Sequence, residues 1–104
     1  MARFVLDPCV EDELWAMWEF ISQDNPPAAN RVIEAAYQTF QQIAANPEIG
    51  PRRKFRNARL RHVRSFPISG FDRYLIFYRV LAGSIQVLHV YHGARDIASL
   101  FGDK

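Results

Sequence analysis

The chain has 104 residues, 49% of them hydrophobic, with 13 basic and 11 acidic side chains and a single cysteine. A chain of this length folds around one hydrophobic core, so we expect a single domain over residues 1–104. Its apolar runs fall short of the ~20 residues that cross a bilayer, its start is too short and too acidic for a signal peptide, and one thiol excludes an intramolecular disulfide. We therefore expect a cytoplasmic protein without membrane contact, held together by packing.

Charge is divided unevenly along the chain. Residues 1–51 hold two basic and eight acidic side chains, a net charge of −6, whereas residues 52–104 hold eleven basic and three acidic ones, a net charge of +8. An asymmetry of this kind indicates a surface for an anionic partner, either nucleic acid or an acidic protein segment. The alternative is a solvated basic face.

The first half predicts a short strand followed by two helices. Residues 3–6 form an apolar extended run, and Asp7 followed by Pro8 predicts a helix over residues 8–23 with Asp7 as its N-cap. Apolar residues recur on one face of this helix at three- and four-residue steps. Residues 24–27, Asp-Asn-Pro-Pro, end it and begin a second helix that runs to about residue 46. Because few residues join them, the two helices should lie antiparallel.

The second half predicts strands. One is expected within residues 59–66 and ends at Pro67, a second covers residues 73–81, and a third covers residues 85–92 after a tight connection. Residues 95–101 predict a short helix or turn. The fold class is therefore α+β, with an N-terminal strand and an antiparallel helical hairpin packed on a small sheet that a three-strand antiparallel meander completes.

The last two strands are apolar on both faces. In the final strand, Ile85, Val87 and His89 alternate with Leu88 and Val90. Such strands need cover on both sides, and one helical hairpin covers only one. We expect either a partner chain on the other face or a sheet that curls over itself.

Metal and nucleotide motifs are absent from the sequence. His62, His89 and His92 have no cysteine or second histidine at ligand spacing, and no glycine-rich phosphate loop occurs, so neither a metal site nor a cofactor is expected.

Arginine is the side chain that suggests a site. Seven of the residues from 52 to 64 are basic and none is acidic, and the planar guanidinium pairs with phosphate or carboxylate oxygens. His92 and Arg95 lie where the last strand ends, and there they can supply a general base or acid and a phosphate-binding cation for RNA cleavage. The structural alternative is that Arg95 and Asp96 pair with each other or cap the tail. The candidate partner-binding residues are Arg52, Arg53, Lys54, Arg56, Arg61, Arg64 and Arg95.

Five segments in this order resemble the ParE/RelE superfamily of toxins from bacterial type II toxin–antitoxin modules. They are Asp24-Asn25-Pro26, residues 46–50, Leu60-Arg61, residues 74–80 (YLIFYRV) and residues 87–96 (VLHVYHGARD). The resemblance implies the α+β fold above and an antitoxin partner in a toxin–antitoxin hetero-oligomer.

The resemblance leaves the cellular target open between two branches. RelE-like members cleave mRNA on the ribosome, but their second-strand lysines fall near Phe66 and Ile68, their third-strand arginine at Leu75 and their tail tyrosine at Phe101. Only Arg95 matches that pattern, although a one-residue slip would bring Arg73 or Tyr74 to the third-strand position, and some family nucleases use a histidine like His92.

The ending Gly93-Ala94-Arg95-Asp96 and the strand Ile76-Phe77-Tyr78-Arg79-Val80 look more like the ParE branch. ParE-like members inhibit DNA gyrase without hydrolytic chemistry, and an antitoxin whose C-terminal segment wraps across the toxin neutralises them. The resemblance therefore implies a gyrase inhibitor. The alternatives are a ribosome-dependent mRNA endonuclease that uses His92 and Arg95, and a non-toxic homologue that only binds its antitoxin.

Overall fold

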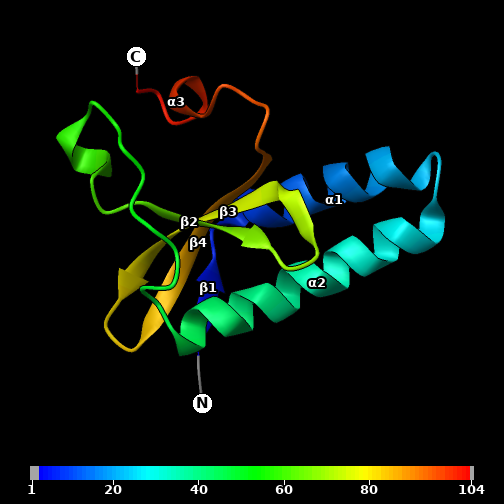
Figure 1. Ribbon diagram of the computed structural model, residues 1–104, viewed down its shortest axis with the longest axis horizontal. Helices are drawn as coiled ribbons and strands as arrows, with labels where there is room; N and C mark the ends of the chain where they lie inside the picture. The colour runs from blue at the N-terminus through cyan, green and yellow to red at the C-terminus, as the bar shows by residue number, and fades with distance from the viewer. Residues whose placement is uncertain (1–2, 104) are drawn as a thin grey trace.

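The computed structural model describes residues 3–103 and has the predicted α+β class. Strand β1 (Phe4–Leu6) is followed by helices α1 (Pro8–Ser22) and α2 (Pro26–Ala45), and then by a turn of 3-10 helix, η1 (Ala58–Leu60). Strands β2 (Arg64–Ile68), β3 (Phe71–Leu81) and β4 (Ser84–His92) form the meander, and α3 (Ile97–Leu100) closes the chain. Figure 1 shows the antiparallel hairpin of α1 and α2 projecting past the sheet.

The sheet has the order β1-β4-β3-β2, in which β1 runs parallel to β4 and the meander strands pair antiparallel. The helical hairpin packs on one face of it. The core on that face is built from apolar side chains of all four strands and of both helices. Its fully buried members include Val10, Phe40, Ile43, Ile76, Tyr78, Ile85 and Val87.

The predicted start of α2 is confirmed and that of α1 needs a correction. The helix begins at Pro26 as predicted, and Asn25 Oδ1 caps it by accepting a hydrogen bond from the Ala28 amide at 3.1 Å. Asp7 stands at the N-cap of α1 but makes no side-chain capping bond. Its carboxylate instead accepts from the side-chain amide of Gln86 on β4, because β1 and β4 bring these two residues together.

The first meander strand lies later than predicted. Residues 58–60 form η1, in which the Asn57 side chain accepts from the Arg59 amide at 2.9 Å, so the strand begins only at Arg64. Pro67 lies inside β2 and does not end it, because β2 is an edge strand and the missing N–H of proline costs no ladder bond there.

The alternation predicted for β4 is wrong at His89 and Val90. Phe77 pairs with His89 and Tyr78 with Val87, so Leu88 is an extra residue that forms a bulge in β4. The bulge places Val90 in the helix-facing core with Val87, and it turns His89 to the other face.

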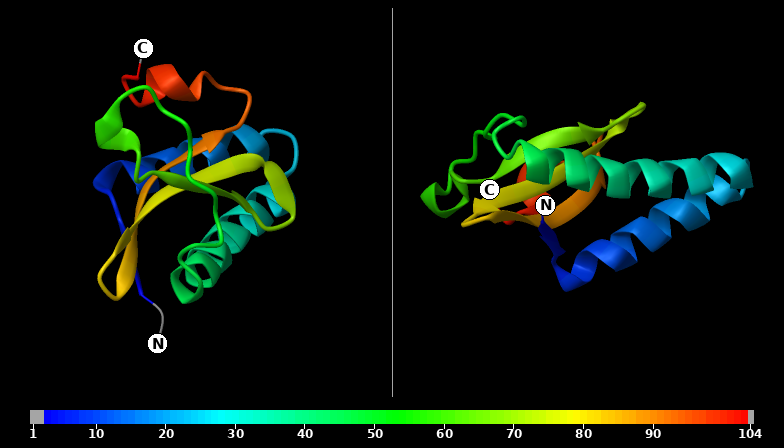
Figure 2. Two further views of the ribbon diagram at one scale, coloured as in Figure 1. Left: turned by 60° about the vertical axis from the view of Figure 1, so that its left-hand side comes forward. Right: turned by 90° about the horizontal axis from the view of Figure 1, so that it is seen from below.

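The second face of the sheet is covered by the chain itself. The segment before β2 and the tail with α3 lie over this face, on the side away from the helical hairpin (Figure 2). We call the resulting apolar group the second-face cluster. It consists of buried Val63, Phe77, Tyr91 and Ile97, with partly buried Phe55, Leu60, Leu75, Leu88, Leu100 and Phe101 around them. The expectation that this face needs a partner chain or a curled sheet is therefore wrong.

Candidate functional site

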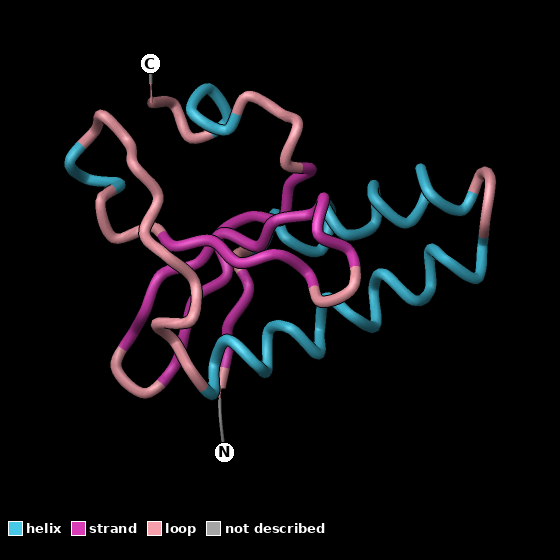
Figure 3. The backbone as a smooth tube through the Cα atoms, viewed as in Figure 1, coloured by secondary structure: helices cyan, strands magenta, loops and turns pink. Residues whose placement is uncertain are grey.

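The basic segment, residues 51–63, is a loop with one helical turn that crosses the second face (Figure 3). Phe55 packs on the Phe101 ring at a centroid distance of 5.1 Å. The amides of Arg56 and Asn57 donate to the buried Asp103 carboxylate at 2.6 and 2.7 Å. These contacts hold the apolar side chains of the segment against the sheet and leave its cations facing outward.

The basic candidates divide into exposed and structural residues. The exposed group, which we call the basic surface, consists of Arg52, Lys54, Arg56 and Arg61. Arg53 lies 5.4 Å above the Phe77 ring, and Arg64 Nη1 donates to the Gly50 carbonyl at 2.8 Å. In residues 3–103 the one ion pair joins His89 to Glu13. None of the four cationic groups of the basic surface therefore forms an ion pair within the described residues.

His92 and Arg95 lie together at the end of β4. They share a cavity of about 510 Å³ with Tyr74 and with Met17 and Phe20 of α1. The His92 ring meets the Tyr74 ring edge-on at 5.2 Å, and its Nδ1 accepts from the Ala94 amide at 3.0 Å, which leaves Nε2 to carry a proton.

The tail role suggested by the sequence belongs to Asp96 and not to Arg95. Asp96 accepts from the amide and hydroxyl of Ser99 and caps α3, and these bonds lower the pKa of its carboxyl. The guanidinium of Arg95 lies 5.2 Å above the Tyr91 ring and is exposed. Arg95 is therefore available to a ligand that enters the cavity.

Two large aromatic side chains of α1 face solvent. Trp15 is 60% exposed and Phe20 is 71% exposed, so neither widens the core. Trp15 stacks on Trp18, and both line a groove of about 430 Å³ between α1 and α2 that Ile33 and Tyr37 complete. This groove is a second surface on which an apolar partner segment can pack.

Sequence reasoning missed a group of polar side chains at the edge of β4. Glu13 of α1 accepts from the Val90 amide at 2.9 Å and lies 2.7 Å from His89 Nδ1, while Cys9 donates to the Leu88 carbonyl at 3.4 Å. Burial, and then the charge of Glu13, raise the pKa of Tyr91 to about 12. The four-residue spacing of Cys9 and Glu13 on one helix was the only local signal, because His89 lies far along the chain.

Comparison with known families shows the family to which the chain belongs. The family model described as ParE toxin of type II toxin-antitoxin system, parDE, matches residues 4–97. The chain belongs to the ParE toxin family. Its fold is also similar to a solved structure titled "Chromosomal ParDE TA system from P. aeruginosa", with a TM-score of 0.68 and 15% identity over 88% of this chain and 96% of that chain. No curated protein matches the chain.

Four of the five positions that the resemblance assigns to RelE-like catalytic side chains are apolar and packed in this ParE-family chain. Ile68 is fully buried on the helix side of the sheet, and Phe66 packs against the same core. Leu75 and Phe101 belong to the second-face cluster. None of these four side chains can stabilise phosphate charge or donate a proton.

Tyr74 is the residue of the slipped alignment that reaches His92. Tyr74 pairs directly with His92 across β3 and β4. Arg73, the other candidate, is exposed and lines a separate hollow with His92 and Gly93.

The helices of residues 3–103 include none with the length and hydropathy that a membrane span requires.

Proposed function

We propose that this ParE-type toxin acts in the cytoplasm by binding: it inhibits DNA gyrase, and a cognate antitoxin holds it inactive in a hetero-oligomer. The observation that carries the proposal is the basic surface, four exposed cations without an acidic partner among the described residues. Burying such cations against another protein is favourable when that protein supplies carboxylates. An acidic antitoxin segment and an acidic face of the target both meet this requirement.

The groove between α1 and α2 supports the same proposal. Its exposed tryptophan, Trp15, lies on the acidic helical half of the chain, whereas the basic surface lies on the sheet half. An antitoxin that contacts both surfaces would therefore carry apolar residues for the groove and acidic residues for the basic surface.

One observation favours a second candidate, a ribosome-dependent mRNA endonuclease. His92, Arg95 and Tyr74 line one cavity, so an imidazole, a guanidinium and a phenol are within reach of one ligand. The apolar residues at the other nuclease positions argue against this function, and so we rank it second. A homologue without toxicity that only binds its antitoxin is the third candidate.

Two assays separate these functions. The purified protein is added to a gyrase supercoiling reaction and to cell-free translation with mRNA integrity followed on gels. Loss of supercoiling with intact mRNA supports the proposal. Cleavage of mRNA that His92→Ala abolishes overturns it in favour of the nuclease, and no response in either assay overturns it in favour of the non-toxic homologue.

Antitoxin binding is tested with the product of the neighbouring small reading frame. Reversing the four charges of the basic surface to glutamate should weaken this complex by at least about tenfold and reduce its salt dependence. Arg31→Glu on the exposed side of α2 is the matched control and should leave affinity unchanged. Equal affinity for the fourfold variant and the control would remove the basic surface from the proposed interface.

A further inference from the structure

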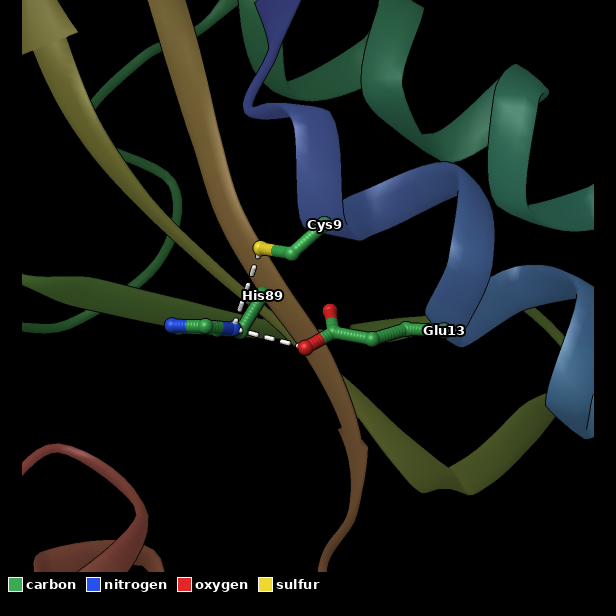
Figure 4. Close-up of side chains that lie close together, drawn as sticks. All are labelled: Cys9, Glu13 and His89. Atoms are coloured by element: carbon green, nitrogen blue, oxygen red, sulfur yellow. Dashed lines mark hydrogen bonds and ion pairs between the residues drawn. The ribbon is translucent and has the colours of Figure 1, made fainter.

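Three side chains with different ligand atoms converge where α1 passes the edge of β4. Cys9 and Glu13 are four residues apart and project from the same side of α1, and His89 points toward both from the strand (Figure 4). The sulfur, one carboxylate oxygen and one imidazole nitrogen all lie within 4.8 Å of one another. We call these three residues the edge cluster.

The fold itself produces this convergence. Strand β1 pairs with β4 only as far as Val87, so the edge of β4 is unpaired beyond it. Helix α1 then runs along that edge, where Cys9 donates to the Leu88 carbonyl and Glu13 Oε1 accepts from the Val90 amide. His89, which the bulge at Leu88 places on the second face, reaches them at this edge, with its Nδ1 3.6 Å from Cys9 Sγ and 2.7 Å from Glu13 Oε2. The Val90 amide thus orients the Glu13 carboxylate before and after an ion binds, whereas the Cys9 bond to Leu88 is given up when the thiol loses its proton.

The separations suit a small tetrahedral ion. Zinc bonds of about 2.3 Å to sulfur and about 2.0–2.1 Å to nitrogen place these two atoms roughly 3.5 Å apart. Cys9 Sγ and His89 Nδ1 are 3.6 Å apart. Glu13 Oε2 lies closer to Nδ1, at 2.7 Å, because the two atoms share a proton when no ion is bound. Replacing that proton by an ion requires the carboxylate to retreat by roughly 0.6 Å.

The surroundings of the edge cluster favour a cation. The carboxylates of Glu13, Asp7 and Asp12 lie near the Cys9 sulfur, and their negative charges repel a thiolate there. A divalent ion reverses this balance, because it attracts the carboxylates and stabilises the thiolate. Thiolate and imidazole select borderline ions such as Zn²⁺ over Mg²⁺ and Ca²⁺.

We propose that Cys9, Glu13 and His89 bind a Zn²⁺ ion through Sγ, Oε2 and Nδ1, with water at the fourth position. On binding, the Cys9 thiol releases its proton to solvent, and His89 bonds as the neutral imidazole whose proton is on Nε2 and whose Nδ1 lone pair faces the ion, which ties α1 to the edge of β4. This site is separate from the basic surface, and the proposal of a zinc site does not depend on the proposed toxin function.

The unmodified protein provides the first test, because Cys9 is the only cysteine of the chain and thiol chemistry reports this site alone. Tag-free protein is titrated with Zn²⁺ and with Co²⁺. We expect one equivalent bound, a thiolate-to-cobalt charge-transfer band in the near ultraviolet, and alkylation of Cys9 by iodoacetamide slowed at least about tenfold by Zn²⁺ and restored by chelator. Failure to take up one equivalent, or a cobalt spectrum without the thiolate band, overturns the proposal.

Matched histidine variants provide the second test. Cys9→Ser, Glu13→Gln and His89→Gln should each weaken Zn²⁺ binding by about tenfold or more, whereas His62→Gln and His92→Gln remove the other two histidines and should not. If a control variant abolishes binding, the ion lies elsewhere and the proposal is wrong. If the edge-cluster variants lose stability and the native protein binds no ion, the three side chains only form hydrogen bonds and the proposal is also wrong. Should an edge-cluster variant fail to fold, the cobalt spectrum of the native protein decides.

Discussion

Tyr78 anchors the start of the basic segment, and Tyr78→Phe measures how strongly. The ring is fully buried, and its hydroxyl donates to the Pro47 carbonyl at 2.6 Å and accepts from the Gly50 amide at 3.0 Å. Each such bond contributes about 0.5–1.5 kcal/mol, and a buried polar group left without a partner costs about 1–3 kcal/mol. Because Phe keeps the packing, we expect Tyr78→Phe to lower the free energy of unfolding by about 2 kcal/mol, which lowers Tm by about 8–16 °C.

Urea unfolding of both proteins, together with amide hydrogen exchange, checks this prediction. If the hydroxyl holds the turn, exchange should accelerate at Gly50 and at Ser65, whose amide donates to the Pro51 carbonyl across the segment. Tyr74→Phe is the matched control, because the Tyr74 hydroxyl has no hydrogen bond among the described residues, and it should change stability by less than about 0.5 kcal/mol. A loss below about 0.5 kcal/mol for Tyr78→Phe, with unchanged exchange at Gly50, would refute the anchoring role.

Three further substitutions test the packing and the electrostatics. Gly50→Ala should destabilise by at least about 2 kcal/mol in urea unfolding, because a Cβ there overlaps the Ser65 carbonyl oxygen; a neutral result would show that the turn can move. Phe101→Ala should lower the free energy of unfolding by about 2–3 kcal/mol, because Phe101 packs in the second-face cluster. Phe20→Ala should lower it by less than about 0.5 kcal/mol, because Phe20 is exposed, and equal losses for the two variants would contradict this placement. Burial raises the pKa of Tyr91 to about 12, above the unfolded value of about 10, so unfolding in urea at several pH values should show stability lost as the pH rises from about 10 to 12. The Tyr91→Phe variant should lose less stability between these pH values. If stability falls with pH as steeply in this variant as in the unmodified protein, other groups cause the loss.

Periodicity and the positions of the prolines predicted the helices and strands of the fold. They did not predict the local departures from regular structure. Helical spacing and the prolines at residues 26 and 27 predicted α2 correctly, because both signals lie within a few residues. The bulge at Leu88 was missed, because it depends on how β4 pairs with β3. The Asp7 cap failed for a similar reason, since its competitor Gln86 comes from a strand at the other end of the chain.

The candidate surfaces were likewise predicted only where their signal lies within a short stretch of sequence. The basic run was visible in the sequence, but its separation into exposed residues and structural ones such as Arg53 and Arg64 required the structure. The edge cluster was invisible, because Cys9 and His89 are 80 residues apart and no motif links them. Sequence patterns therefore identified the charge of the surface, and tertiary contacts identified which side chains are available.

The closed edges of the sheet limit how any partner can bind. Along the outer edge of β2, the Ser65 amide is already bonded to the Pro51 carbonyl, and Pro67 two residues later has no N–H to offer. Beyond β1, the edge of β4 is occupied by Cys9 and Glu13. A partner that adds a strand has only the three-residue edge of β1 left, which is too short to hold one firmly. We therefore expect an antitoxin or target to bind mainly through side chains, for which the basic surface, the groove between α1 and α2 and the cavity at Arg95 are the candidates.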